Sequence, residues 1–350
     1  MELSSQALLV LKKAGERMLL GYIAKRLAQI IPLLLCISVI VFIVIQLPPG
    51  DYLTTVIRQR ELSGTKMDES EIIALKLKYG LDKPMYMQYF GWITNIVTRG
   101  DFGRSFLWEQ PVSKIIGERL GMTMLVSFIC LVFTWIVALP IGIYSATHQY
   151  SLGDYFFSAI GFIGVSVPGF LLALFTIYLV YSQTGVAISG LFSLPYQTAG
   201  WSLAKVLDML PRLGVLVLII GIANTATMIR TTRAMMLDEL SKQYVITARA
   251  KGVLERRLIF KYPVRMAINP LVSTIGMSLA GLVSGETIVS LVFNMPTAGP
   301  MMYNALLVQD MYLAGSFLLI VSCMVVFGTL LSDIMLAILD PRIRFGGAVE

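Results

Sequence analysis

A strongly basic segment is the part of this sequence best suited to binding chemistry. Between Tyr244 and Pro270 the chain carries six cations, which are Arg249, Lys251, Arg256, Arg257, Lys261 and Arg265, against one anion, Glu255. The segment also contains the small residues of the string TARAKG, which a purely electrostatic surface would not need. Nucleic acid, lipid headgroups and a partner protein are the three ligands to compare.

The residue types in this segment favour a partner protein. A helix lying on a lipid surface needs bulky apolar residues opposite its cations, whereas Thr247, Ala248 and Ala250 insert poorly into lipid. Single-stranded nucleic acid is bound by aromatic side chains placed among cations, and here Phe260 and Tyr262 stand at the far end. The pattern predicts a short helix that ends at Gly252 and seats its small residues in a groove of another protein, followed by a second amphipathic helix.

Catalytic chemistry has little support in the sequence. The chain contains no G-x-x-x-x-G-K-[ST] loop, no H-E-x-x-H pair and no G-x-S-x-G elbow. Its single histidine is His148, and its cysteines, Cys36, Cys130 and Cys323, all lie in apolar runs, so neither a disulfide framework nor a metal site is expected. We predict that the chain is not an enzyme and binds no cofactor, so any ATP and Mg would be bound by a partner.

Polar residues within apolar runs are candidates for a transport path. An acidic residue at the middle of a membrane costs about 2.5–3.5 kcal/mol, so it usually faces protein or water. Asp333 lies near the end of its run, which favours a structural role. Glu286 lies about two-thirds of the way along its span, and a structural role and a proton or substrate relay are equally compatible with that place. The candidate path residues are Ser166, Asn224, Ser284 and Glu286.

The elements that position these residues are membrane spans. A mean hydropathy of +0.76 with 14% charged residues in 350 positions indicates an all-α polytopic membrane protein. Six runs are long enough to cross a bilayer and contact membrane lipid. They are Leu27–Leu47, Gly121–Thr147, Phe157–Tyr181, Leu213–Leu237, Met266–Phe293 and Met311–Leu339. Pro168 can bend the third span.

The distribution of basic residues predicts the orientation. With both termini on one side, the terminal segments 1–26 and 340–350 and the range Arg230–Arg265 place sixteen Lys and Arg there. The short connections on the other side hold Lys205 and Arg212. The positive-inside rule therefore places both termini and the loop 238–265 in the cytoplasm.

The segment 48–120 is the sizeable region on the outer side. The string ESEIIALKLKYG predicts a helix that ends at Gly80, and PMYMQYFGWITNIVTRG predicts a second helix that begins after Pro84. A small helical cap over a pore mouth is the simpler interpretation. A docking surface for an external protein is the alternative.

Several segments carry a resemblance to a known family. The string YVITARAKGVLERRLIFKYPVRMAINPLVSTIG resembles the cytoplasmic EAA loop of permeases of ATP-binding-cassette (ABC) importers, in the branch that handles dipeptides, oligopeptides, nickel and some oligosaccharides. Similar pieces lie in the same order along the chain, including RLAQIIPLLLCISVIVFIVIQLPPGD, PVSKIIGERLGMT, SGETIVSLVFNMPTAGPMMYNAL and LDPRIRFGG. The resemblance covers about Tyr22 to Gly347. Ile246 and Thr247 stand where the general motif has Glu and Ala, and Pro263 also departs from it.

The resemblance implies a type I importer fold, with six transmembrane helices and an outer helical domain, in a bacterial or archaeal inner membrane. It implies four kinds of partner: a second, paralogous permease that completes the pore, two cytoplasmic ATPases and an external solute-binding protein. The core would span 121–339, and the ATPases would grip a coupling helix at about Ser241–Gly252. The residues assigned to that contact are Tyr244, Thr247, Ala248, Ala250, Lys251, Gly252, Leu254, Glu255 and Arg256.

The substrate and the class of transporter have alternatives. The string LPPGDYLTT is more like oligosaccharide importers than dipeptide importers, with peptides next and nickel also within the branch. A proton-coupled secondary transporter using Glu286 is a rival, although it would show an inverted repeat. A membrane scaffold or receptor subunit without a pore is a second rival.

Overall fold

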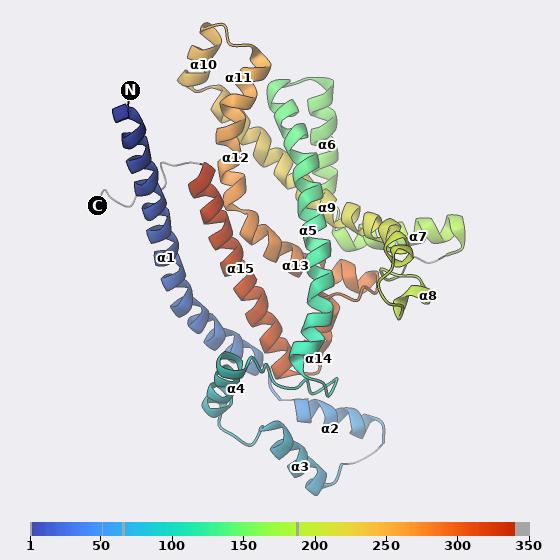
Figure 1. Cartoon of the computed structure of the whole chain (residues 1–350). Helices are drawn as coiled ribbons and strands as arrows, with labels where there is room; N and C mark the ends of the chain where they lie inside the picture. The colour runs from blue at the N-terminus through green and yellow to red at the C-terminus, as the bar shows by residue number, and fades with distance from the viewer. Residues whose placement is uncertain (1, 51, 65–66, 187–188, 340–350) are drawn as a thin grey trace.

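The computed structural model describes residues 2–50, 52–64, 67–186 and 189–339, and within them the chain forms helices and no strand. Figure 1 shows the arrangement. The helices are α1 (Glu2–Gln46), α2 (Tyr52–Leu62), α3 (Glu69–Tyr79), α4 (Met85–Arg99), α5 (Val112–Thr147), α6 (Leu152–Ser166), α7 (Gly169–Thr184), α8 (Leu194–Gln197), α9 (Leu203–Leu240), α10 (Gln243–Ala250), α11 (Glu255–Lys261), α12 (Pro263–Ser273), α13 (Ile275–Val292), α14 (Ala298–Leu307) and α15 (Met311–Leu339).

Four helices are long and apolar enough to cross a membrane. They are α1 over Arg26–Gln46, α5, α9 and α15 over Met311–Leu336. They match the predicted first, second, fourth and sixth spans and confirm an all-α polytopic membrane protein. Three of them begin before the predicted spans, because hydropathy marks only the apolar part, whereas helical hydrogen bonding continues through polar residues.

The predicted third span, Phe157–Tyr181, is not one continuous helix. It consists of α6 and α7, which are bent by 98° at a short break, and counting this pair as one span gives up to five candidates among the described residues. The break includes Pro168, which has no backbone N–H to continue the helix and disfavours helical geometry at Val167. Pro168 therefore separates two helices instead of only bending one.

The predicted fifth span, Met266–Phe293, is also interrupted. It is formed by α12 and α13, which are separated at Thr274. Pro263 is the first residue of α12, where a missing N–H is tolerated, so it marks the boundary between α11 and α12. The side chains of Ser284 and Glu286 lie outside the described residues.

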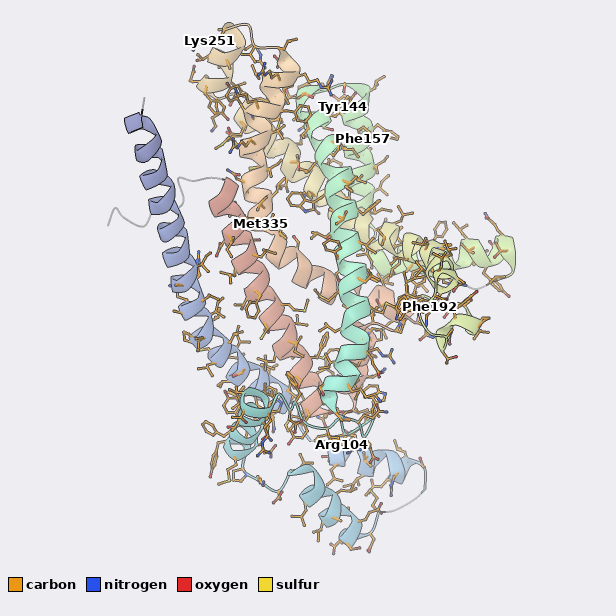
Figure 2. All side chains as sticks on the ribbon, in the orientation of Figure 1. Arg104, Tyr144, Phe157, Phe192, Lys251 and Met335 are labelled. Carbon is orange, nitrogen blue, oxygen red and sulfur yellow. The ribbon has the colours of Figure 1, made fainter. Side chains whose placement is uncertain are left out.

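The two ends of the molecule carry different elements. In Figure 1, α10 and α11 lie at one end, together with the start of α1 and the end of α15, while α2, α3 and α4 lie at the other. Figure 2 shows the same separation, with Lys251 at one end and Arg104 near the other. α5 has 36 residues and is therefore about 54 Å long at 1.5 Å per residue. Long helices thus connect two ends that meet different surroundings.

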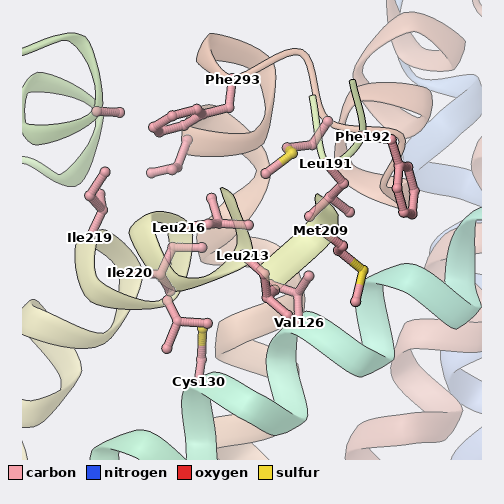
Figure 3. Close-up of a cluster of buried hydrophobic side chains, with 14 residues drawn as sticks. Val126, Cys130, Leu191, Phe192, Met209, Leu213, Leu216, Ile219, Ile220 and Phe293 are labelled. Carbon is pink, nitrogen blue, oxygen red and sulfur yellow. The ribbon is translucent and has the colours of Figure 1, made fainter. Parts of the chain in front are cut away.

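α5 and α9 form the main pair at the centre of the chain. A Cβ at Gly142 of α5 would lie 2.6 Å from Cβ of Thr232 on α9, so this crossing requires glycine. Both helices also contribute to a buried apolar cluster that contains Leu191, Phe192 and Phe293 (Figure 3). The positions of α5 and α9 relative to each other are therefore fixed by close packing.

An ion pair joins α6 to α9. Arg233 donates to Asp154 through both Nε and Nη2, at 3.0 and 2.9 Å, and Asp154 is only 3% exposed. The same carboxylate accepts the backbone N–H of Tyr150, and the Ser151 hydroxyl caps α6 by accepting the N–H of Asp154. A bidentate pair has a defined geometry as well as a favourable energy, so it fixes the start of α6 against α9.

A second ion pair joins α1 to α15. Arg26 Nε lies 3.2 Å from Asp333 Oδ2, near the end of α15 that lies toward α10 and α11. Asp333 is therefore paired with a cation of a neighbouring helix, which is consistent with a role in holding α1 and α15 together.

The segment between α1 and α5, which the sequence predicts to lie on the outer side and which is called the outer region below, contains the two predicted helices. α3 ends at Gly80 and α4 ends at Gly100, and both glycines are left-handed, with φ of 66° and 64°. α4 packs on the outer half of α1, where the Phe42 ring contacts the rings of Tyr89 and Trp92 and Ser38 is hydrogen-bonded to the Tyr89 hydroxyl. This region is thus attached to the membrane-spanning part, and α2 is an additional helix that the sequence pattern did not predict.

Asp310 connects the outer region to the start of α15. Its side chain is fully buried, and it accepts the Ser105 hydroxyl at 2.5 Å, the Leu107 N–H at 3.1 Å and the Leu313 N–H at 3.2 Å. Burial raises the pKa of this carboxyl, and these hydrogen bonds oppose that rise. Nearby, Phe106 packs edge-on against Tyr312.

We expect Asp310→Ala to destabilise this junction. The change leaves the buried Ser105 hydroxyl and the Leu107 N–H without their acceptor, and each such loss costs about 1–3 kcal/mol. Thermal unfolding can be followed with a thiol-reactive dye, because unfolding exposes the buried Cys130 thiol above the constant background from exposed Cys36. The variant should melt at lower temperature and be cut faster by protease between residues 48 and 110.

Asp68→Ala is the matched control, because Asp68 is an exposed carboxylate of the same region whose side chain accepts only a local bond from Ser70. Equal melting temperatures for the two variants would contradict the role given to Asp310.

Candidate functional site

The basic segment forms a helical hairpin made of α10 and α11. Gly252 lies just after α10 with φ of 75°, a left-handed conformation that favours glycine. The Val253 N–H donates to the Ala248 carbonyl and the Gly252 N–H to the Arg249 carbonyl, at 3.3 and 3.0 Å. This pair of bonds is a Schellman motif, so Gly252 ends α10 and turns the chain into α11.

The inner face of the hairpin is a small apolar core. Val245, Ala248 and Leu258 are buried, and Val253, Ile259 and Tyr262 pack partly against them. Ala248 therefore packs inside the hairpin, and its contact with a partner stays a prediction. It is small because α11 approaches α10 closely at this position.

Side-chain hydrogen bonds and an ion pair stabilise the outside of the hairpin. Arg249 donates to Glu255 through Nε and Nη2, at 3.0 and 2.5 Å, which joins α10 to α11. The Tyr244 hydroxyl donates to Glu239 of α9, so α10 is also joined to the helix before it. Arg249 lowers the pKa of Glu255, so the pair stays ionised below the pH at which an ordinary glutamate gains a proton.

The remaining predicted contact residues are exposed. Leu254 is the most exposed large apolar side chain of the hairpin, at 79%. The others are Tyr244, Thr247, Ala250, Lys251, Gly252, Glu255 and Arg256. Exposed Leu254 beside several cations can bind an apolar pocket with an acidic rim.

A second candidate site is an open cavity of about 540 Å³ along the helical core, with Asn224 and Thr227 exposed in it, and it is called the interior cavity below. Its walls come from α5, α9, α12 and α13 and the Thr274 break. The lining residues are Leu131, Thr134, Trp135, Asn224, Thr227, Met228, Thr231, Met235, Pro270, Leu271, Ser273, Thr274 and Ser278. Its volume lies within the range of small-ligand sites.

The polar groups of this cavity are neutral. Asn224, Thr227 and Thr231 donate to carbonyls of their own helix, which leaves their oxygens as acceptors. Because no lining residue is charged, the cavity can hydrogen-bond a passing solute but offers no proton relay through its walls. Among the described residues there is also no cluster of three His, Cys, Asp or Glu that could hold a metal.

The structure brings one of the four predicted path residues to this cavity. Asn224 lines it, whereas Ser166 is exposed outside it and donates to the Phe162 carbonyl. Ser284 and Glu286 cannot be placed, because their side chains lie outside the described residues. Sequence reasoning missed Thr227 and Thr231, although they follow Asn224 by three and seven residues, which puts all three on one helix face.

Comparison with known proteins identifies the family of the chain. Residues 138–345 match the family described as "Binding-protein-dependent transport system inner membrane component", and residues 18–127 match the N-terminal part of such membrane components. The chain is 31% identical over 326 residues to the oligopeptide transport system permease protein AppB of Bacillus subtilis, covering 93% of this chain and 99% of that relative.

Two further relatives cover similar lengths. A putative peptide permease protein of Brucella ovis is 32% identical over 93% of this chain and 99% of its own. The glutathione transport system permease protein GsiC of Shigella flexneri is 31% identical over 93% of this chain and 100% of its own. Among solved structures, the MetNI methionine ABC transporter in an inward-facing conformation is 16% identical with a TM-score of 0.48, over 65% of this chain and 96% of that chain.

These matches extend over both the outer region and the membrane-spanning core, and they give no support to a proton-coupled transporter using Glu286. The chain belongs to the family of inner-membrane components of binding-protein-dependent transport systems and is a permease subunit of an ABC importer rather than an enzyme.

Proposed function

We propose that this permease forms half of a pore for short peptides, and that ATPase subunits drive it through the α10–α11 hairpin. The observation that carries the proposal is the connectivity of the hairpin. α10 follows α9 after two residues, and α12 follows α11 after one residue, Tyr262. Both α9 and α12 line the interior cavity, so a push on the hairpin acts on two of the helices that form the cavity walls.

The hairpin is rigid enough to transmit such a push. The Arg249–Glu255 pair joins the end of α10 to the start of α11, and Val245 and Leu258 fill the space between the two helices. The Tyr244 hydroxyl joins α10 to α9. A packed unit of this kind moves as a body instead of absorbing the displacement. The movement would open and close the interior cavity toward either side of the membrane.

The orientation supports cytoplasmic ATPases as partners. We propose that the hairpin and both termini face the cytoplasm, because that end gathers the excess of Lys and Arg. The partners would be two ATPases that bind ATP and Mg, a second permease and an external solute-binding protein that delivers the substrate. This chain itself would bind no cofactor.

Peptides are the substrate class that the relatives favour. The relatives named above carry oligopeptide, peptide and glutathione names, and these names give no support to the expectation of an oligosaccharide. The neutral, hydrogen-bonding interior suits amide groups without holding any one side chain strongly.

We expect Leu254→Glu to uncouple ATP hydrolysis from uptake. The change places a charge where an apolar contact with the ATPase is proposed, and the loss of a central contact residue costs about 2 kcal/mol or more, which lowers the affinity at least about tenfold. Uptake of a radiolabelled tripeptide and ATPase activity are measured in proteoliposomes that contain all partner subunits. Uptake should fall while the purified ATPases hydrolyse ATP as before.

Leu152→Glu is the matched control. Leu152 is 89% exposed and is the first residue of α6, as Leu254 is the residue just before α11. A glutamate at either position lies near the N-terminus of a helix, where the helix dipole favours a negative charge. Normal coupled uptake by Leu254→Glu, or an equal loss in both variants, would count against the hairpin as the coupling element.

We also expect Asn224→Trp to block transport at the interior cavity. The indole adds bulk to a cavity of about 540 Å³, so tripeptide uptake should fall to background while the complex still assembles, as judged by co-purification of its subunits. Leu218→Trp, at an exposed position of the same helix outside the cavity, is the control. Unchanged uptake by Asn224→Trp would exclude this cavity from the path.

A further inference from the structure

A second cavity lies toward the other end of the bundle. It has a volume of about 470 Å³ and is formed by the start of α5, the connection before α8, the start of α9 and the connection between α13 and α14. In Figure 2, Phe192, one of its lining residues, lies toward the end of the molecule that carries Arg104 and far from Lys251. In contrast to the interior cavity, this outer cavity is lined by charged residues: Glu118, Arg119 and Lys205.

Lys205 is held in this cavity by aromatic rings. It is only 7% exposed, and its Nζ lies 4.6 Å from the ring centroid of Phe192 and 5.5 Å from that of Trp201. Nζ donates one hydrogen bond, at 2.5 Å, to the Ala199 carbonyl. An ammonium group has three donors, so the bond to Ala199 leaves donor capacity for a further acceptor in the cavity. Phe192 is fixed in the buried cluster of Figure 3, so the position of the cation is fixed as well.

Arg119 adds a second cation to the same lining. Its side chain is partly buried, and it forms no hydrogen bond or ion pair with the described residues. A partly buried guanidinium group without a partner is stabilised by a carboxylate, which it can bind with two parallel hydrogen bonds. Glu118, the residue before Arg119 in the chain, also lines the cavity and is likewise without a partner among the described side chains.

We propose that the outer cavity binds a peptide by its terminal carboxylate, through Arg119 and Lys205, before the peptide enters the interior cavity. This inference rests on the peptide-import function proposed above and adds the chemical group that is recognised. Glu118 favours a zwitterion over a purely anionic ligand, because its charge repels phosphate and attracts an ammonium group. The volume of the cavity is within the range of small-ligand sites.

Direct binding to the full chain in nanodiscs tests the proposal. The probes are trialanine and its C-terminal amide, which has the same shape without the terminal negative charge. Wild type should bind trialanine more tightly than the amide. Arg119→Gln should weaken trialanine binding about tenfold, because glutamine lacks the charge that strengthens a hydrogen bond to a carboxylate, and should leave amide binding unchanged.

Two variants control for charge and folding. Lys114→Gln removes an exposed cation from the same helix outside the cavity, and should leave binding of both probes as in wild type. Lys205→Met should also lose the preference for the free carboxylate. Lys205→Met also removes the cation from the rings of Phe192 and Trp201 and so could disturb their packing. Lys205→Arg is therefore the control, because it retains a cation and should keep most of the preference.

The outcomes separate this inference from the proposed function. Equal binding of trialanine and its amide by wild type, absence of binding to both, or no effect of Arg119→Gln would overturn the carboxylate site. The same holds if phosphatidylglycerol in the nanodisc, compared with phosphatidylcholine, abolishes the effect of Arg119→Gln, because the site would then hold a lipid phosphate. The proposed function fails instead if the wild-type complex shows no ATP-driven uptake of any peptide.

Discussion

Backbone hydrogen bonding inside a bilayer is the constraint on which the rest of this structure depends. A peptide group in hydrocarbon has no water to bond, so a chain that crosses the membrane must satisfy its N–H and C=O groups within helices. Near Pro168 and Pro263 the backbone lacks a donor, and the helices end there. Movement in such a protein is therefore concentrated at a few breaks and in the displacement of whole helices.

α9 is a continuous helix that connects the two ends of the molecule. It begins beside the aromatic cage of Lys205, continues along the interior cavity at Asn224 and Thr231, and leads into α10. The close contact at Gly142 and the buried Asp154–Arg233 pair hold it against α5 and α6. One continuous helix thus joins the proposed ATPase contact to both cavities, and a displacement at α10 has a direct mechanical path.

The two cavities differ in charge, and this difference suits a transport path. Charged groups at the outer cavity can attract a zwitterion and orient it, whereas the interior cavity offers only neutral hydrogen-bonding groups and apolar walls. Strong binding in the interior would slow release, because each factor of ten in affinity is about 1.4 kcal/mol that must be overcome to leave. A neutral interior allows passage.

The sequence by itself determined the features that depend on local chemistry. Hydropathy identified the four continuous spans, and left-handed glycine ends identified α3 and α10 through Gly80 and Gly252. Only the tertiary structure decided that Ala248 packs under Leu258, that Phe157–Tyr181 bends by 98°, and that Asp310 bonds Ser105 across 205 residues. The periodicity of one helix shows which residues share a face but not which neighbour that face meets, because a contact depends on two elements and on the chain that brings them together.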